Sequence, residues 1–323
     1  MALANGPRVV AVTGAAGYVG RRLVAALLEQ ARIERVVALD VRPIEMRHDR
    51  LRAARHDITE PMEQIFASEG VEGVVHLAFV LRHMPKRSAS HRVNVDGTAN
   101  LLSACEATGV SRIVIMSSST VYGAHRDNPP VLTEEALARP SPLFHYAWDK
   151  AEAERMAMRY ANAHPEAAVS LLRMCVVMGP SADNFITAAL AKPVLIGVRK
   201  YDPGLQFVHE DDVARLLVRF AMERHPGVYN VAGPGTVHWS EFARIAKRPM
   251  LWLPASLAYA LTDAAWLLRL QHDSPGIGLD FIRWPWVVGT DKLERELEYH
   301  FQYTSEEALR SYLERGRRAA ALP

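Results

Sequence analysis

The chain has few cysteines and little net charge, and each shortage excludes a class of protein. Cys105 and Cys175 are its only cysteines, too few for the multi-bridge framework of a small secreted domain. Both lie in apolar stretches, so we expect buried thiols rather than reactive ones. The 38 Lys and Arg residues nearly balance the 36 Asp and Glu residues. This balance gives no reason to expect a nucleic-acid partner.

Long apolar runs are also missing. The longest apolar stretch, 255–270, is interrupted by Thr262, Asp263 and Arg269 and is shorter than the ~18–20 residues of a membrane span. We expect an amphipathic helix packed on its own domain, without stable membrane insertion. A cap over a lipophilic pocket and contact with a membrane surface are the alternatives. The N-terminus shows no signal-peptide pattern, so a cytoplasmic location is predicted.

The first half of the chain alternates between strand and helix signals. Continuous apolar runs, typical of strands buried on both faces, occur at 8–13, 35–40, 73–78, 112–117 and 169–174. Helical patterns occur at 21–32, 94–108 and 146–164. Together they predict β-α-β units and an α/β fold with a Rossmann-type, doubly wound parallel sheet.

The pattern changes after Gly179, where the strands become shorter and most of the tryptophans occur. We therefore predict a Rossmann domain over 1–174 and a smaller α/β substrate-binding domain over 175–323. Some segments of the second half, such as 205–233, are expected to return to the Rossmann core.

A glycine-rich turn joins the first strand to the first helix. Residues 13–20 read TGAAGYVG, which gives the spacing G-x-x-G-x-x-G. Glycine leaves the backbone bare for a tight turn and for close approach of a pyrophosphate, which the N–H groups and the dipole of the helix attract. The residues of this turn expected to bind a dinucleotide are Gly14, Gly17, Tyr18, Val19 and Gly20.

Carboxylates follow two strands near this turn. Asp40 ends the second strand, 20 residues after Gly20. There it can accept hydrogen bonds from ribose hydroxyls and would repel a 2′-phosphate, which favours NAD over NADP. Arg42 could offset that repulsion. Asp57 and Ile58 are placed to meet the adenine, although a simple strand-end carboxylate is the alternative at Asp57.

A candidate catalytic pair lies on the helix that starts near residue 146. Tyr146 and Lys150 are four residues apart, so they share one helix face. A nearby cation is expected to lower the pKa of a phenol, which would let Tyr146 exchange a proton with a substrate alcohol during hydride transfer. Ser117 and Ser118 lie at the carboxyl end of the strand at 112–117, and ligands bind at the carboxyl ends of parallel strands. A hydroxyl there can hold the substrate oxygen.

These motifs, in this order, resemble the extended short-chain dehydrogenase/reductases over residues 8 to about 315. The resemblance is strongest to the NAD-dependent epimerase/dehydratase group, particularly to proteins similar to UDP-glucose 4-epimerases. It implies a Ser118, Tyr146 and Lys150 catalytic set, with Lys150 also on the nicotinamide ribose. It implies a homodimer as well. The segments that carry it include 13–20, Asp40, 57–58, 76–78, 94–98, 117–123, 146–150, 173–180, 207–213 and 229–233. Among them, Leu77, Ala78 and Asn94 are expected at the cofactor.

The sequence departs from those relatives at several positions. Val176 replaces a usual asparagine, and Leu205-Gln206 replaces a polar pair before Phe207, which weakens the case for a UDP-sugar. Ser119-Thr120 stands where dehydratases carry Asp-Glu, so dehydration is not expected. Asp149 replaces a small residue within the Tyr146–Lys150 motif, and we expect it to face solvent.

Three functions follow from these observations. The leading one is an NAD-dependent epimerase acting on a nucleotide sugar by Tyr-assisted reversible hydride transfer. The second is an NAD(P)-dependent dehydrogenase or reductase of a hydrophobic alcohol or ketone, similar to 3β-hydroxysteroid dehydrogenases. The third is a dinucleotide-binding regulator without turnover, which would not need the full catalytic set. No metal site is predicted.

Overall fold

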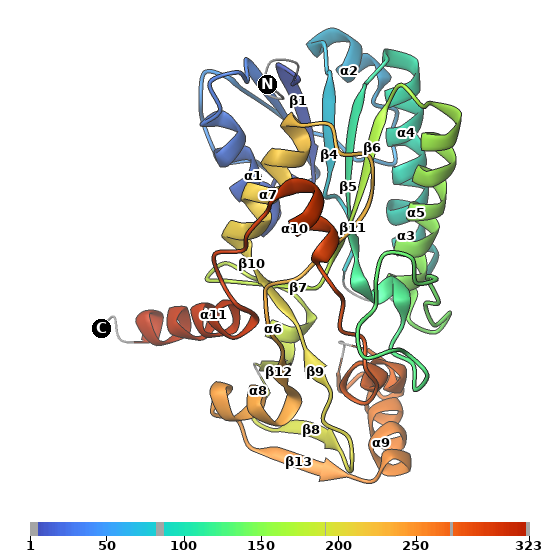
Figure 1. Ribbon diagram of the computed structural model, residues 1–323, viewed down its shortest axis with the longest axis vertical. Helices are drawn as coiled ribbons and strands as arrows, with labels where there is room; N and C mark the ends of the chain where they lie inside the picture. Colours follow the sequence, from blue (N-terminus) through green and yellow to red (C-terminus); the bar gives the residue numbers. More distant parts are fainter. Residues whose placement is uncertain (1–5, 82–86, 191, 272–273, 321–323) are drawn as a thin grey trace.

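The computed structural model describes residues 6–81, 87–190, 192–271 and 274–320. Within them, the larger part is built on seven parallel strands in the order β11-β6-β5-β4-β1-β2-β3. The strands are β1 (Val9–Thr13), β2 (Arg35–Asp40), β3 (Leu51–Arg55), β4 (Gly73–His76), β5 (Arg112–Ser118), β6 (Ala168–Met174) and β11 (Gly227–Val231). β2, β4 and β6 are buried along nearly their whole length, as continuous apolar runs require. The prediction of a Rossmann-type sheet is confirmed (Figure 1).

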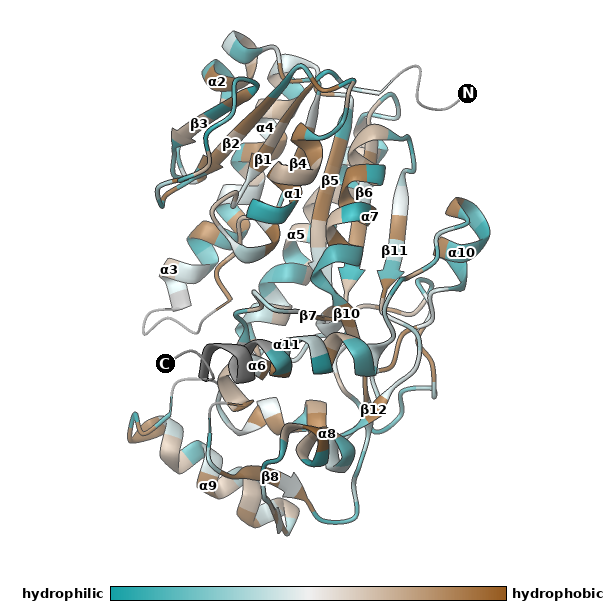
Figure 2. Ribbon diagram, turned by 90° about the vertical axis from the view of Figure 1, so that its left-hand side faces the viewer, coloured by the Kyte–Doolittle hydropathy of each residue, from teal (hydrophilic) through white to brown (hydrophobic). Residues whose placement is uncertain are grey.

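Helices cover both faces of this sheet. α1 (Tyr18–Leu28) and α7 (Glu210–Met222) pack against each other on one face, and α2 (Glu63–Glu69), α4 (Gly97–Thr108) and α5 (His145–Ala163) cover the other (Figures 1 and 2). The chain enters α4 through α3 (Arg87–His91) and a π-helical turn, η2 (Arg92–Asp96), and a 3₁₀ turn, η3 (Ser119–Tyr122), follows β5. The predicted helices at 21–32 and 146–164 begin earlier, at Tyr18 and His145.

The strand order reverses between β1 and β4. From β1 the chain proceeds outward to β2 and β3, whereas β4, β5 and β6 extend in the other direction. Loops leaving the carboxyl ends of β1 and β4 therefore separate, and a ligand crevice forms at such a switch point.

A smaller lobe lies beyond the carboxyl end of the sheet. It contains the strand pairs β7 (Val176–Met178) with β10 (Phe207–His209), β9 (Gly204–Leu205) with β12 (Val237–His238), and β8 (Leu195–Val198) with β13 (Met250–Leu253). Its helices are α6 (Phe185–Leu190), α8 (Trp239–Ala246), α9 (Ala255–Leu267) and the 3₁₀ helix η4 (Gly276–Ile282). α10 (Asp291–Leu297) contacts β11, and α11 (Ser305–Ala320) contacts β10. Since β11 pairs with β6, part of 205–233 lies in the large sheet.

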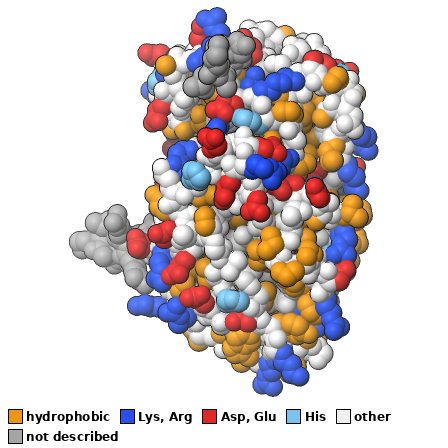
Figure 3. Space-filling model, viewed as in Figure 1, with side chains coloured by type: hydrophobic (Ala, Val, Ile, Leu, Met, Phe, Trp, Pro, Cys, Tyr) orange, Lys and Arg blue, Asp and Glu red, His pale blue; other side chains and the backbone are white. Residues whose placement is uncertain are grey.

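The stretch 255–270 forms a helix, α9, which packs on η4 and β8 but leaves most of its apolar side chains uncovered. Of the thirteen residues of α9, only Ala258 is buried. Its leucines are exposed, and the lower end of the molecule in Figure 3, where Figure 1 places α9, shows apolar and basic side chains together. The expectation of a buried apolar stripe is therefore wrong. In the described part of the chain, no helix is both long enough and apolar enough to cross a membrane.

Candidate active site

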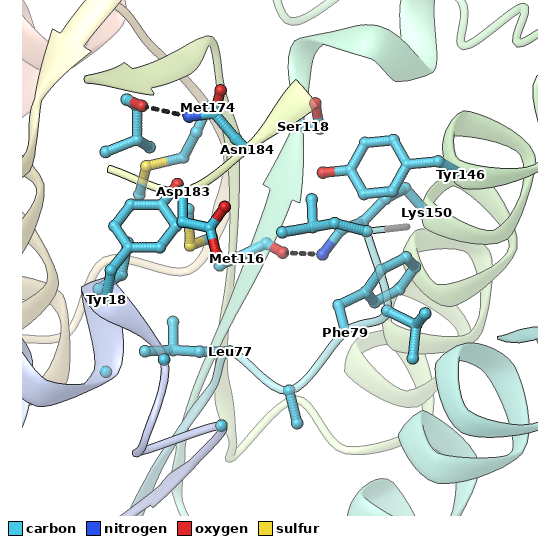
Figure 4. Close-up of a pocket in the computed structure, with 18 of the residues that line it drawn as sticks. Tyr18, Leu77, Phe79, Met116, Ser118, Tyr146, Lys150, Met174, Asp183 and Asn184 are labelled. Carbon is cyan, nitrogen blue, oxygen red and sulfur yellow. Dashed lines mark hydrogen bonds between the residues drawn. The ribbon is translucent and has the colours of Figure 1, made fainter. Parts of the chain in front are cut away.

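A cavity of about 990 Å³ opens at the carboxyl ends of the central strands. The glycine turn, the ends of β2, β4 and β5, and the start of α5 all contribute to its wall (Figure 4). The predicted site residues that line it are Gly14, Gly17, Tyr18, Val19, Gly20, Asp40, Asp57, Ile58, Leu77, Ala78, Ser117, Ser118, Tyr146 and Lys150. The structure thus brings together residues that are up to 136 positions apart in the chain, from Gly14 to Lys150.

Bare backbone is required at the glycine turn. Gly14 has a φ of +71°, and a Cβ there would lie 2.6 Å from the Ala78 nitrogen. A Cβ on Gly20 would lie 2.2 Å from the Gly14 oxygen. Gly17 is the N-cap of α1 and offers no side chain to cap it. The first N–H groups of α1 are therefore left for a ligand, which is the arrangement that binds phosphates.

Asp40, at the end of β2, is fixed against the glycine turn by hydrogen bonds. Its carboxylate accepts hydrogen bonds from the Ala16 nitrogen at 3.0 Å and from the Arg42 nitrogen at 2.9 Å. The Arg42 guanidinium also pairs with it, at 3.2 Å from Nε. Arg42 thus lies beside the carboxylate, where it could also meet a phosphate. Asp57 accepts two hydrogen bonds from Thr59, both of 2.9 Å.

The predicted catalytic residues come together from β5, which carries Ser118, and from α5, which carries Tyr146 and Lys150. Tyr146 lies beside Ser118 at the end of β5, and the Ser118 hydroxyl accepts hydrogen bonds from the nitrogen and the hydroxyl of Thr120 at 3.2 and 2.9 Å. Lys150 Nζ donates to the Met116 carbonyl at 2.5 Å and lies 3.6 Å from the centroid of the Phe79 ring. Phe79 also meets the Tyr146 ring edge to face, with centroids 5.6 Å apart. Figure 4 shows the hydroxyl and the ammonium both directed into the cavity.

Burial dominates the titration of this pair in the free protein. It raises the pKa of Tyr146 to about 12, against the opposing effect of the neighbouring Ser118 hydroxyl. It lowers the pKa of Lys150 to about 7, against the opposing charge of Glu154. The pKa of Tyr146 is therefore raised, contrary to the expectation that Lys150 lowers it. The physical reason is that both groups lose water, and the ammonium binds a carbonyl and a ring rather than the phenol.

Asp149 is buried, not solvent-facing as expected. Its side chain is 1% exposed and binds His91 Nδ1 at 2.9 Å and Asn94 Nδ2 at 3.1 Å. The turn η2 packs on α5, and its Asn94 covers the side of the helix that carries Asp149.

Asn94, expected at the cofactor, is not among the residues that line the cavity. Its Oδ1 accepts from the Val80 nitrogen at 2.7 Å. Asn94 therefore holds the segment after β4, and that segment carries Phe79 to the catalytic pair. Asp149 in turn holds Asn94.

The remaining wall of the cavity is largely apolar. Val176 and Val177 of β7 contribute to it, together with Met174 and, from the C-terminal part of the chain, Trp286. Sequence reasoning found Val176 but missed Phe79 and Trp286. Phe79 directly follows the Leu77-Ala78 motif, and this position is the signal that could have found it, but no local pattern marks Trp286.

Two hydroxyls of the cavity wall have no partner in the protein. Among the described residues, Ser117 Oγ and Ser119 Oγ are buried and make no hydrogen bond. Buried hydroxyls are rarely left without partners, so their position beside Ser118 fits a site that binds a polar ligand. The described residues contain no group of three or more His, Cys, Asp or Glu side chains that could hold a metal ion.

Comparison with known proteins agrees with this geometry. Residues 10–232 match the sequence model of the NAD dependent epimerase/dehydratase family. An uncharacterised protein of Mycobacterium tuberculosis is 30% identical over 322 residues, covering 96% of this chain and 84% of that protein. UDP-glucuronic acid decarboxylase 4 of Arabidopsis thaliana is 30% identical over 260 residues, covering 74% of this chain and 56% of that protein.

Solved structures extend the likeness over the whole fold. MoeE5 in complex with UDP-glucose and NAD superposes with a TM-score of 0.76 at 28% identity, covering 97% of this chain and 99% of that chain. The UDP-glucose 4-epimerase of Thermotoga maritima has a TM-score of 0.77 at 20% identity, with the same coverage, and supports the fold alone. The prediction of an extended short-chain dehydrogenase/reductase is confirmed: the chain belongs to the NAD dependent epimerase/dehydratase family.

Proposed function

We propose that the protein is an NAD-dependent epimerase that acts on a nucleotide-linked sugar by reversible hydride transfer at a single carbon. The observation that carries this proposal is the convergence of Tyr146, Ser118 and Lys150 on the cavity that the bare glycine turn also lines. Hydride transfer between a dinucleotide and a substrate carbon requires that the glycine turn and these three side chains line the same cavity.

The residues present fit NAD. The N–H groups at the start of α1 would bind its phosphates, and Asp40 would accept hydrogen bonds from the adenosine ribose. Asp57 and Ile58 would border the adenine, and Leu77 and Ala78 would pack on the dinucleotide. When bound, NAD supplies a hydride acceptor and a positively charged ring. Because the Asp40 carboxylate repels a 2′-phosphate, NAD is favoured over NADP.

Tyr146 would act as the base and acid of the reaction. Its side chain and that of Ser118 line the same cavity, so both hydroxyls can contact one substrate oxygen. The positively charged ring of NAD would favour the phenolate. We therefore expect the pKa of Tyr146 to fall from about 12 when the cofactor binds. Tyr146 then takes the hydroxyl proton of the substrate and later returns it to the same oxygen.

Several observations support a nucleotide sugar and epimerisation. MoeE5, which is 28% identical over nearly the whole chain, was crystallised with UDP-glucose and NAD.

Dehydration needs an additional acid and base beside the reacting carbon. Here the two residues after Ser118 are Ser119 and Thr120, and the carboxylates that line the cavity are Asp40, Asp57 and Asp183, the last of them beside Tyr18. Simple return of the hydride to the opposite face needs no further carboxylate.

A second function has an observation of its own. The wall formed by Met174, Val176, Val177 and Trp286 would suit an apolar alcohol or ketone. In that case the protein would be a dehydrogenase or reductase with net consumption of the cofactor.

One experiment separates these functions. Purified protein is denatured and its bound nucleotide identified by mass; separately, the native protein is incubated with a panel of nucleotide sugars without added cofactor. We expect retained NAD and conversion of one sugar into its epimer without net absorbance change at 340 nm. Turnover that requires added NAD(H) and changes the absorbance would favour the dehydrogenase. Absence of any bound or bindable dinucleotide would contradict both.

A further inference from the structure

The apolar stripe of α9 is turned to solvent. Leu257, Leu261 and Leu268 follow one another at helical spacing, with Leu267 beside them, and are 45%, 49%, 69% and 80% exposed. Ala260 and Ala264, at the intervening positions, are exposed as well. An ordinary surface helix shows the opposite arrangement, with its polar face outward. Leu251 and Leu270 extend this exposed area, which we call the leucine surface (Leu251, Leu257, Leu261, Leu267, Leu268 and Leu270).

The other side of α9 is the one that contacts the protein. Tyr259 hydrogen-bonds to Asp280, and Asp263 accepts from the Gly276 nitrogen at 2.7 Å. Both bonds fix α9 to η4. None of the described residues 255–270 lines the cavity. The leucine surface is therefore not a cap over the substrate, and its apolar area faces outward from a helix that is already packed.

Basic side chains accompany the leucine surface. The segments 192–202 and 236–270, which form this part of the lobe, hold seven Lys and Arg against three Asp and Glu, whereas the whole chain is nearly balanced. Arg199 and Lys200 are exposed next to the end of β13, where the Arg199 nitrogen donates to Leu253, just before α9 begins. Arg269 is exposed at its other end. Apolar and basic side chains adjoin at this end of the molecule (Figure 3).

We propose that the leucine surface docks onto the surface of an anionic lipid bilayer. Exposed leucines can enter the boundary of the acyl chains while the flanking Arg and Lys meet anionic headgroups. α9 has only thirteen residues, so it lies along the bilayer instead of crossing it. A protein partner fits less well, because interface centres are rich in exposed aromatic side chains, and the exposed residues here are Leu and Ala.

Vesicle binding tests the proposal with the full chain. Cosedimentation is measured with phosphatidylcholine vesicles and with vesicles containing about a third phosphatidylglycerol. We expect binding to the anionic vesicles that weakens at high salt, because the contacts with headgroups are screened. The double variant Leu267→Glu/Leu268→Glu should lose binding by at least about tenfold, since each change places a carboxylate at the lipid contact.

A matched control is available in the large domain. Leu137 is 80% exposed, like Leu267, and Leu137→Glu should bind vesicles as the unaltered protein does. Thermal unfolding and cofactor retention show that each variant is folded. The proposal is wrong if the unaltered protein ignores anionic vesicles, or if the double variant binds them equally well. It is also wrong if light scattering shows a dimer that only the double variant disrupts, since a second copy would then cover the surface.

Discussion

The two halves of the cavity are built by different means. The half that would hold NAD consists mainly of main chain and of side chains at strand ends, such as Gly14, Gly20 and Asp40, within the first forty residues. The half that would hold the substrate is a wall of apolar side chains from β6, from β7 and from Trp286, which follows β7 by more than a hundred residues. Dinucleotide binding can be encoded in one local motif, whereas the apolar wall depends on residues that only the fold brings together.

Tyr146 stands where these halves meet, so its loss should have the largest effect. Tyr146→Phe removes the proton donor and acceptor but keeps the ring that packs on Phe79. We expect kcat to fall by about 10²–10⁴-fold, with NAD still retained. Turnover and the mass of the bound nucleotide are measured on the same preparation. Full activity in this variant would remove Tyr146 from the mechanism.

The glycine turn offers a graded test of the cofactor half. In Gly20→Ala the new Cβ would lie 2.2 Å from the Gly14 oxygen, so the turn must shift, at a cost of about 1–3 kcal/mol. Both the thermal stability and NAD affinity should fall. In Gly17→Ala the closest atom is 3.1 Å away, and the methyl group occupies the cavity edge.

Gly17→Ala should therefore weaken NAD binding while the unfolding temperature of the free protein stays nearly unchanged. Calorimetric titration with NAD and thermal unfolding of both variants check the difference. Equal losses of stability in the two variants would show that the turn, and not ligand approach, requires glycine at both positions.

Asp149 supports the catalytic pair from behind and should have an intermediate effect. In Asp149→Asn only one oxygen is left to accept hydrogen bonds, although His91 and Asn94 both bind this side chain. A buried group that loses its partner costs about 1–3 kcal/mol. We expect a lower unfolding temperature and roughly tenfold lower kcat, because Asn94 no longer fixes the segment that carries Phe79.

The control for Asp149 is Glu152→Gln on the same helix, whose carboxylate pairs with Arg155 near the surface. It should leave kcat and stability close to those of the unaltered protein, as surface ion pairs contribute little. Unchanged kcat in Asp149→Asn, with only a loss of stability, would reduce Asp149 to a structural residue.

The sequence predicts the strands, the glycine turn and the catalytic set well, because each depends on local periodicity or on fixed spacing along one element. It fails where a second layer decides the environment. Asp149 lies on α5 among charged and polar residues, but η2 covers it there. The apolar stripe of α1 is buried under α7, whereas the stripe of α9 is exposed. Periodicity shows which face is apolar, but it does not show what covers that face.

Val176 gives the smallest and most discriminating prediction, in the substrate half. It is buried in the wall, and its main chain pairs with Phe207 in β10, so a change of side chain should leave the strand intact. For a nucleotide sugar, Val176→Asn adds an amide that can bind a hydroxyl or phosphate oxygen, and kcat/KM should rise by a few-fold, up to about tenfold for ~1.4 kcal/mol. For an apolar substrate the same amide is left unpaired and kcat/KM should fall. Val176→Ala separates the amide from the loss of bulk, and a fall in Val176→Asn that Val176→Ala does not share would favour the dehydrogenase over the epimerase.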